Sequence, residues 1–247
     1  RITARGKTRT HRMLLKEAET RIELPEGFES ALVNEGGHGF YRVRYAPALL
    51  TRVLCLMPDG LAAIERFNVV NDAWAAAVAG LMPLPDYLEL TARFRTDRDR
   101  NVWALLIESF HMLNRIIEPA DRPALEALVR DRIGPAVAEL GWVAHPAESE
   151  LTRQLRGDLL RALGTIGNDR IVQTRAAELY AEHTRDGAAR RSNAIDPNVL
   201  PALIAVPFVT GFLMMHPAIN PFGYQGTFFV HIMSANLIFV LTPVTKL

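Results

Sequence analysis

Cysteine is nearly absent from this sequence, since Cys55 is the only one among 247 residues. A single cysteine excludes an internal disulfide framework and a zinc cluster built on several thiolates. An excess of charge of either sign is also lacking, because 28 lysines and arginines stand against 27 acidic residues. The resulting net charge of +1 gives no electrostatic reason to expect nucleic acid as a partner. We therefore expect a folded protein that does not bind nucleic acid.

Charged side chains are missing from one long stretch, Pro197 through Thr245. Its best apolar run, residues 228–241, is shorter than the roughly 20 residues that cross a bilayer, and it contains His231 and Asn236. The amphipathic pattern of the preceding sequence is lost at Pro207. We therefore predict an atypical apolar tail over residues 207–247. A chimeric or frame-shifted end explains it better than a membrane hairpin, and we do not expect a membrane partner.

The histidine spacing of a helical zinc site is lacking as well. In His-Glu-x-x-His the two histidines share one helical face because they lie four residues apart. None of the seven histidines here is followed by glutamate, and no two are separated by four positions. His38 and Glu35 lie close together in a glycine-rich turn, but two potential ligands do not make a metal site. We therefore predict no metal ligand and no catalytic residue in this chain.

The most informative pattern that is present occupies residues 33–45. A polar turn from Asn34 to Gly39 leads directly into residues 40–45, where side chains alternate between two sides. The alternation predicts a strand. From Ala46 onward helical spacing takes over, so this stretch closes a β part and opens a helical one.

The rest of the chain divides along the same line. Strands are predicted over Thr10–Leu15, Thr20–Leu24 and Phe28–Val33. Residues 46–206 have apolar residues at i, i+3 and i+4 in segments separated by proline and glycine, which predicts helices of about 10–20 residues. The fold class is therefore predicted as mainly α, an antiparallel HEAT-like helical stack preceded by a few β-strands. The expected domains are residues 1–45, 46–206 and 207–247.

Four segments in this order resemble zinc aminopeptidases of the aminopeptidase N type: residues 34–45, 65–74, 100–103 and 150–153. The resemblance covers roughly residues 10–206. It implies that the β part is the end of a β-sandwich domain and that the helices belong to the C-terminal domain of such an enzyme. The His-Glu-x-x-His site and the Gly-x-Met-Glu-Asn substrate loop of that family are both absent.

The resemblance thus implies the non-catalytic C-terminal part of a zinc aminopeptidase that removes N-terminal residues from peptides. Zinc would belong to the parent enzyme, and this chain, which begins Arg-Ile-Thr, would be an inactive piece of it. The helical domain would enclose the active site and control substrate access. Its partners would be peptide substrates and the N-terminal catalytic domain. Abundant arginine and alanine suggest a bacterial, cytoplasmic enzyme. The alternative is a stand-alone helical scaffold that binds a protein or peptide partner.

Two sets of residues are singled out as site candidates. Arg153, Arg156 and Arg161 could line the enclosed cavity and attract peptide carboxylates, although solvent-facing positions on an amphipathic helix are the plainer interpretation. Arg42 is expected to pair with Asp72, because an arginine flanked by apolar residues needs an acidic partner if it is buried. The residues expected to form the junction between the β part and the helices are Asn34, Gly39, Phe40, Tyr41, Arg42, Tyr45, Asp72 and Trp74.

Overall fold

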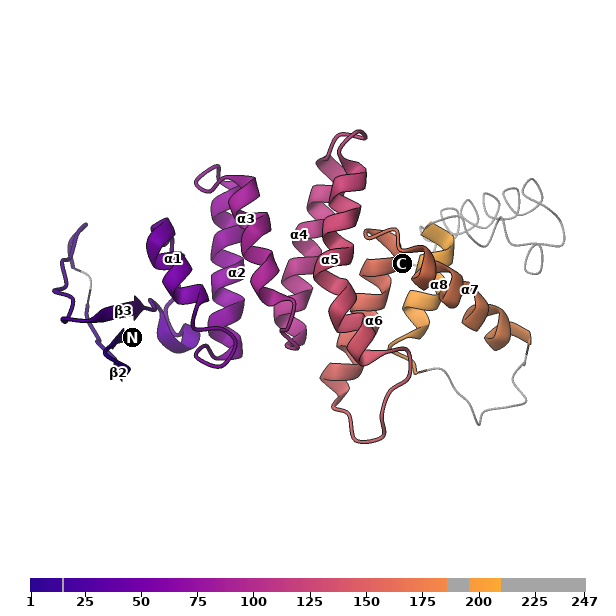
Figure 1. Cartoon of the computed structure of the whole chain (residues 1–247), viewed down its shortest axis with the longest axis horizontal. Coiled ribbons are helices and arrows are strands. Elements are labelled where there is room, and N and C mark those ends of the chain that lie inside the picture. Colours follow the sequence, from indigo (N-terminus) through magenta and orange to yellow (C-terminus); the bar gives the residue numbers. More distant parts are fainter. Residues whose placement is uncertain (15, 186–195, 210–247) are drawn as a thin grey trace, which may run out of the picture. The chain divides into compact units, whose positions relative to one another are not determined.

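A computed structural model describes residues 1–14, 16–185 and 196–209 (Figure 1). Within these residues a small sheet is followed by eight α-helices, and the prediction of a mainly α chain that begins with a few strands is confirmed. The strands are β1 (Ile2–Ala4), β2 (Lys7–Arg9) and β3 (Phe28–Ala31). The helices are α1 (Pro47–Leu54), α2 (Ala63–Val78), α3 (Leu84–Thr91), α4 (Arg100–Ile116), α5 (Arg122–Leu140), α6 (Glu150–Thr165), α7 (Arg170–Arg185) and α8 (Leu200–Val209).

The chain divides into two compact units, residues 1–112 and 113–247, and the division falls within α4. The domain boundary expected after residue 45 remains a prediction. Helix α8 continues to Val209, three residues past the expected end of the helical domain at residue 206. Residues 210–247 of the expected apolar tail lie outside the described residues. Among the residues that are described, no helix has both the length and the apolar character needed to cross a membrane.

The sheet has the strand order β2-β1-β3, with antiparallel pairing throughout. A two-residue turn joins β1 to β2, since Ala4 pairs with Lys7. Arg5 and Gly6 in this turn have φ values of 48° and 67°, in the left-handed region that the tightest hairpins require. The dipeptide Arg5-Gly6 is therefore the hairpin signal of this part of the sequence.

Three strand predictions are wrong, and two of them belong to one predicted hairpin. Residues 10–14 and 16–25 form no ladder, so the predicted hairpin of Thr10–Leu15 with Thr20–Leu24 is replaced by the earlier one at β1 and β2. Residues 40–46 also belong to no strand, although alternation predicted one over residues 40–45. A ladder needs a neighbouring backbone, and in the described structure side chains bind this segment instead. The strand predicted from Phe28 is confirmed over Phe28–Ala31.

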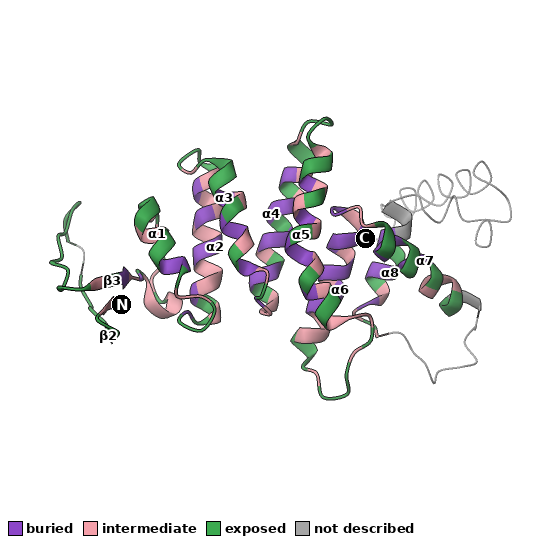
Figure 2. Cartoon of the chain, in the orientation of Figure 1, coloured by how far each residue is buried: buried purple, intermediate pink, exposed green. Residues whose placement is uncertain are grey.

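The helices of the first unit bury one face each, as Figure 2 shows: buried bands alternate with intermediate ones in α2 and with exposed ones in α3. The spacing of apolar residues at i, i+3 and i+4 causes this, because it places them on one side of the helix. In α2 the buried apolar residues are Val69, Val70, Ala73 and Ala76. The rings of Trp74 in α2 and Tyr87 in α3 lie 4.9 Å apart between their centroids, so an aromatic contact joins these two consecutive helices.

In the second unit α6 packs against α5, α7 and α8. Two glycines of α6 allow the close approach of the α8 segment. A Cβ atom on Gly157 would lie 1.9 Å from the carbonyl oxygen of Asn198, and one on Gly164 would lie 2.6 Å from the side chain of Val206. No other residue type fits either position without moving the backbone or the valine. Consecutive helices thus pack together inside this unit, which is the arrangement that the predicted helical stack requires.

Candidate functional site

The turn between β3 and α1 is closed by one asparagine. Asn34 has a φ of 58°, a left-handed conformation that asparagine tolerates better than most residues. Its side-chain oxygen accepts the backbone N–H of Gly39 at 2.6 Å, and its side-chain nitrogen donates to the Gly39 carbonyl at 3.0 Å. A Cβ atom on Gly39 would lie 2.1 Å from the ring of Tyr41. The spacing from Asn34 to Gly39 therefore has a physical cause.

Asp72 of α2 holds the segment that follows this turn. Its carboxylate accepts the backbone N–H of Val43 at 3.1 Å and the guanidinium of Arg42, also at 3.1 Å. The predicted pair of Arg42 with Asp72 is confirmed. The two side chains differ in exposure, however: 60% for Arg42 and 10% for Asp72. The pair is therefore close to a surface pair, worth roughly 0.2–1 kcal/mol, and the larger cost of a buried unpaired charge does not apply to Arg42.

The other junction candidates have unequal roles. The hydroxyl of Tyr45 accepts the backbone N–H of Val33 at 3.0 Å, which ties both ends of the turn together. Burial raises the pKa of the Tyr45 hydroxyl, so the group stays a neutral hydrogen-bonding partner. By contrast, Phe40 and Tyr41 are exposed, Phe40 completely so. In the described structure the Phe40 ring covers nothing at the junction, whereas the Tyr41 ring lies against Gly39.

Glu65 is the junction residue that sequence reasoning missed. Its side chain is 2% exposed and lies at the first turn of α2. One carboxylate oxygen accepts the N–H of Gly36 at 3.1 Å, the other accepts the N–H of Ala62 at 2.9 Å, and Arg1 donates to both. A glutamate at the third helical position is a known N-terminal signal. That signal was available in the sequence, whereas the contacts with Arg1 and Gly36 depend on the fold.

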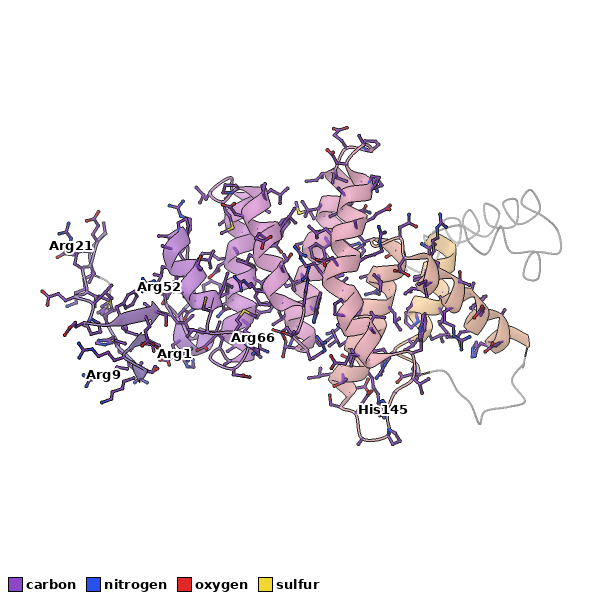
Figure 3. The ribbon with its side chains drawn as sticks, viewed as in Figure 1. Arg1, Arg9, Arg21, Arg52, Arg66 and His145 are labelled. Atoms are coloured by element: carbon purple, nitrogen blue, oxygen red, sulfur yellow. The ribbon has the colours of Figure 1, made fainter. Side chains whose placement is uncertain are left out.

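Arginines connect the sheet and the helices of the first unit (Figure 3). Arg52 of α1 lies beside β3, where its guanidinium donates to the carbonyls of Phe28 and Glu29 at 3.0 and 3.2 Å and lies 5.3 Å from the Phe28 ring centroid. Arg66 of α2 forms two hydrogen bonds with Asp97, at 2.6 and 3.2 Å, and donates a third to the Leu61 carbonyl. The Asp97 side chain has 0% exposure. This ion pair ties α2 to the turn that precedes α4.

The three arginines proposed from α6 are not equivalent. Arg156, expected to face a substrate, is instead 1% exposed inside the second unit. Its guanidinium binds both carboxylate oxygens of Glu148, at 2.5 and 2.6 Å, and the carbonyl of Leu140 at 3.2 Å. The hydrogen bonds from Arg156 hold the pKa of Glu148 below its usual range. Arg156 therefore fixes the loop between α5 and α6, near the labelled His145 in Figure 3, and is not available to a peptide.

Arg153 and Arg161 remain candidates for contact with a peptide. Both side chains are half-buried. Arg161 donates to Asp158 at 2.9 Å, one turn away on the same helix. Within the described ranges Arg153 has no ion-pair partner, and its inner guanidinium nitrogen is buried without a hydrogen bond. A guanidinium in this state can bind a carboxylate that approaches from outside. A metal has no comparable place, because no group of three His, Cys, Asp or Glu side chains gathers in the described part of the chain.

Comparisons with known proteins agree on one family. Residues 31–210 match the family model described as ERAP1-like C-terminal domain. The chain is 29% identical over 144 residues to Aminopeptidase M1-A of Oryza sativa subsp. japonica, covering 57% of this chain and 16% of that protein. It is 25% identical over 174 residues to Alanine/arginine aminopeptidase of Saccharomyces cerevisiae, covering 69% of this chain and 20% of that protein. With Glutamyl aminopeptidase of Bos taurus the identity is 25% over 155 residues, covering 61% of this chain and 16% of that protein. The chain thus spans between 16% and 20% of the length of these relatives.

Proposed function

The chain belongs to the ERAP1-like C-terminal domain family, and on this premise we propose that it is the non-catalytic C-terminal part of a zinc metallo-aminopeptidase. In this proposal the parent enzyme removes N-terminal residues from peptides, and the helical domain encloses the active site and controls which peptides reach it. Zinc is assigned to the catalytic part of the parent, because the sequence has no His-Glu-x-x-His. A cytoplasmic setting is part of the proposal.

The observation that carries the proposal is the junction in the first unit. Asn34 shapes the turn, Glu65 binds its backbone at Gly36, and Asp72 binds the backbone at Val43. Two carboxylates and an amide hold this segment at three points, and they thereby fix the end of the β part relative to α2. A domain that must keep its place over an active site needs such a fixed connection. A free-standing scaffold has no comparable need for it.

Arg153 and Arg161 supply the means by which the helical domain would act on peptides. A peptide carries a carboxylate at its C-terminus, and a guanidinium binds carboxylates with charge-assisted hydrogen bonds. Arg153 has no competing acidic partner within the described residues, and the Arg161 side chain is 42% exposed beside its partner Asp158. The two arginines would therefore hold the far end of a peptide while its N-terminus reaches the catalytic part. This role concerns binding and orientation, not bond cleavage.

A comparison of substrates in the parent enzyme tests this role. The double variant Arg153→Gln/Arg161→Gln is expected to lower kcat/KM for a nonapeptide at least tenfold, since even one charge-assisted hydrogen bond is worth roughly 1.5–3 kcal/mol. It should leave the hydrolysis of leucine p-nitroanilide unchanged, because that substrate has no carboxylate. The same nonapeptide with an amidated C-terminus should show the low kcat/KM in both the wild-type enzyme and the double variant. Arg175→Gln on α7, an exposed position paired with Glu178, is the matched control. Equal losses for the nonapeptide and the anilide would contradict the proposal.

A further inference from the structure

A groove in the first unit borders the junction at Tyr45 but takes no part in the proposed peptide contacts of α6. It lies between α1 and α3 beside the turn that connects α2 to α3, and its cavity volume is about 820 Å³. This volume falls within the range of small-molecule sites, roughly 300–1,000 Å³. Apolar side chains from three elements line it: Leu50, Leu54, Leu81, Met82 and Leu90. Such a lining gains free energy when it covers an apolar ligand.

Charged residues also line this groove, and they are available to a ligand. Asp86, Glu89 and Arg93 come from α3 and the short 3-10 turn after it, and all three are exposed. In the part of the chain that the structure describes, none of these three side chains has a hydrogen bond or an ion pair. Arg44 is the other lining cation, and its guanidinium is directed to the Leu81 carbonyl at 3.5 Å.

The spacing of the three unpaired groups sets the length of a suitable ligand. Asp86 and Glu89 are three residues apart and therefore share one face of α3. Arg93 follows four residues after Glu89 and seven residues after Asp86, so the acidic groups lie four to seven residues from the basic group. At 1.5 Å per residue the separation along the helix is about 6 Å from Glu89 and about 10 Å from Asp86. An extended peptide of three residues spans about 10 Å.

We propose that this groove binds a short peptide with free termini and apolar side chains, about three residues long. The ammonium group of the peptide binds Asp86 and Glu89, its carboxylate binds Arg93, and its side chains cover the apolar lining. The charge order excludes other ligand classes. A polyphosphate would meet two carboxylates, and a single amino acid has its two charges too close together to reach both ends. The inference goes beyond the proposed access function, which stands whether or not this groove is occupied.

Isothermal titration of the full chain with trileucine tests the site. The expected result is one trileucine bound per chain. The double variant Asp86→Asn/Glu89→Gln should weaken binding at least tenfold, and Arg93→Gln should do so separately. Glu118→Gln, an exposed glutamate of the second unit, should leave the affinity unchanged. Thr51→Trp fills the groove from an exposed position on α1 and should abolish binding. Circular dichroism of each variant confirms that it is folded.

Capped peptides show which end of trileucine meets which charge. N-acetyltrileucine should bind at least tenfold more weakly to the wild-type chain, and it should lose nothing further in the Asp86→Asn/Glu89→Gln variant. Trileucine amide should likewise bind at least tenfold more weakly than trileucine to the wild-type chain. It should lose no further affinity in the Arg93→Gln variant. Binding that survives Thr51→Trp would overturn the proposal, and so would capped peptides that bind as tightly as trileucine. Absence of measurable binding at millimolar trileucine would also overturn it, while leaving the proposed access function untouched.

Discussion

Replacing Asp97 with alanine is expected to lower the free energy of unfolding by about 3–5 kcal/mol, because it removes one half of a buried ion pair. The Asp97 side chain has 0% exposure, and that of Arg66 has 16%. The carboxylate also accepts the backbone N–H of Asp99 at 2.8 Å. In the variant the mostly buried Arg66 guanidinium would lose both hydrogen bonds to Asp97 and keep only the one to the Leu61 carbonyl. Urea denaturation followed by circular dichroism measures the loss.

Asp99→Ala provides a matched control for this prediction. The Asp99 carboxylate accepts the N–H groups of Asn101 and Val102, at 2.9 and 3.1 Å, and so caps the start of α4. Loss of such a cap costs about 0.5–2 kcal/mol. The account requires Asp97→Ala to be clearly more destabilising than Asp99→Ala. Equal losses in the two variants would mean that the pair with Arg66 contributes nothing beyond local capping.

The second large effect is expected in the other unit, at Arg156. Arg156→Ala should lower the free energy of unfolding by about 3–5 kcal/mol, since it leaves Glu148 without its cation and the Leu140 carbonyl without its donor. Arg175→Ala removes an arginine whose side chain is 45% exposed, and it should cost at most about 1 kcal/mol. If the two variants were equally stable, the buried pair would have no structural role.

The pH dependence of the free energy of unfolding provides a second test of the Arg156 prediction. The pKa of Glu148 is lowered in the folded chain, chiefly by hydrogen bonds from Arg156. The folded state therefore binds this proton less readily than the unfolded state does. The stabilisation is fully present above the ordinary glutamate pKa of about 4.3, and it is lost as pH falls through the depressed pKa of the folded state. The difference in stability between wild type and Arg156→Ala should accordingly shrink on acidification below about pH 4.

Local pattern was sufficient to predict the helices and part of the junction. Apolar spacing at i, i+3 and i+4 predicted helices where α2 and α4 form, although Ile64 of α2 and Ile116 of α4 are exposed rather than buried. The pairing of Arg42 with Asp72 followed from the need of an arginine for an acid. Its exposure did not follow, since the apolar neighbours of Arg42 in the sequence do not cover it in the fold.

The remaining features depend on contacts between residues far apart in the sequence. Glu65 binds the turn at Gly36, 29 residues away, and Arg66 binds Asp97, 31 residues away. No periodicity encodes such distances. Alternation over residues 40–45 predicted a strand because it reports which side chains are covered, whereas a ladder depends on a neighbouring backbone. Arg156 looked like a surface residue of an amphipathic helix, and only the position of Glu148 in the preceding loop explains its burial.

The measurement that tests the central claim most directly is an assay of the purified chain for aminopeptidase activity and bound zinc. The claim is that this chain is the non-catalytic part of its parent, and its basis is a sequence without His-Glu-x-x-His. The account predicts no hydrolysis of leucine p-nitroanilide in the presence of added zinc, and less than one zinc bound per ten chains after dialysis. Hydrolysis that a chelator abolishes and zinc restores, with one zinc per chain, would contradict it.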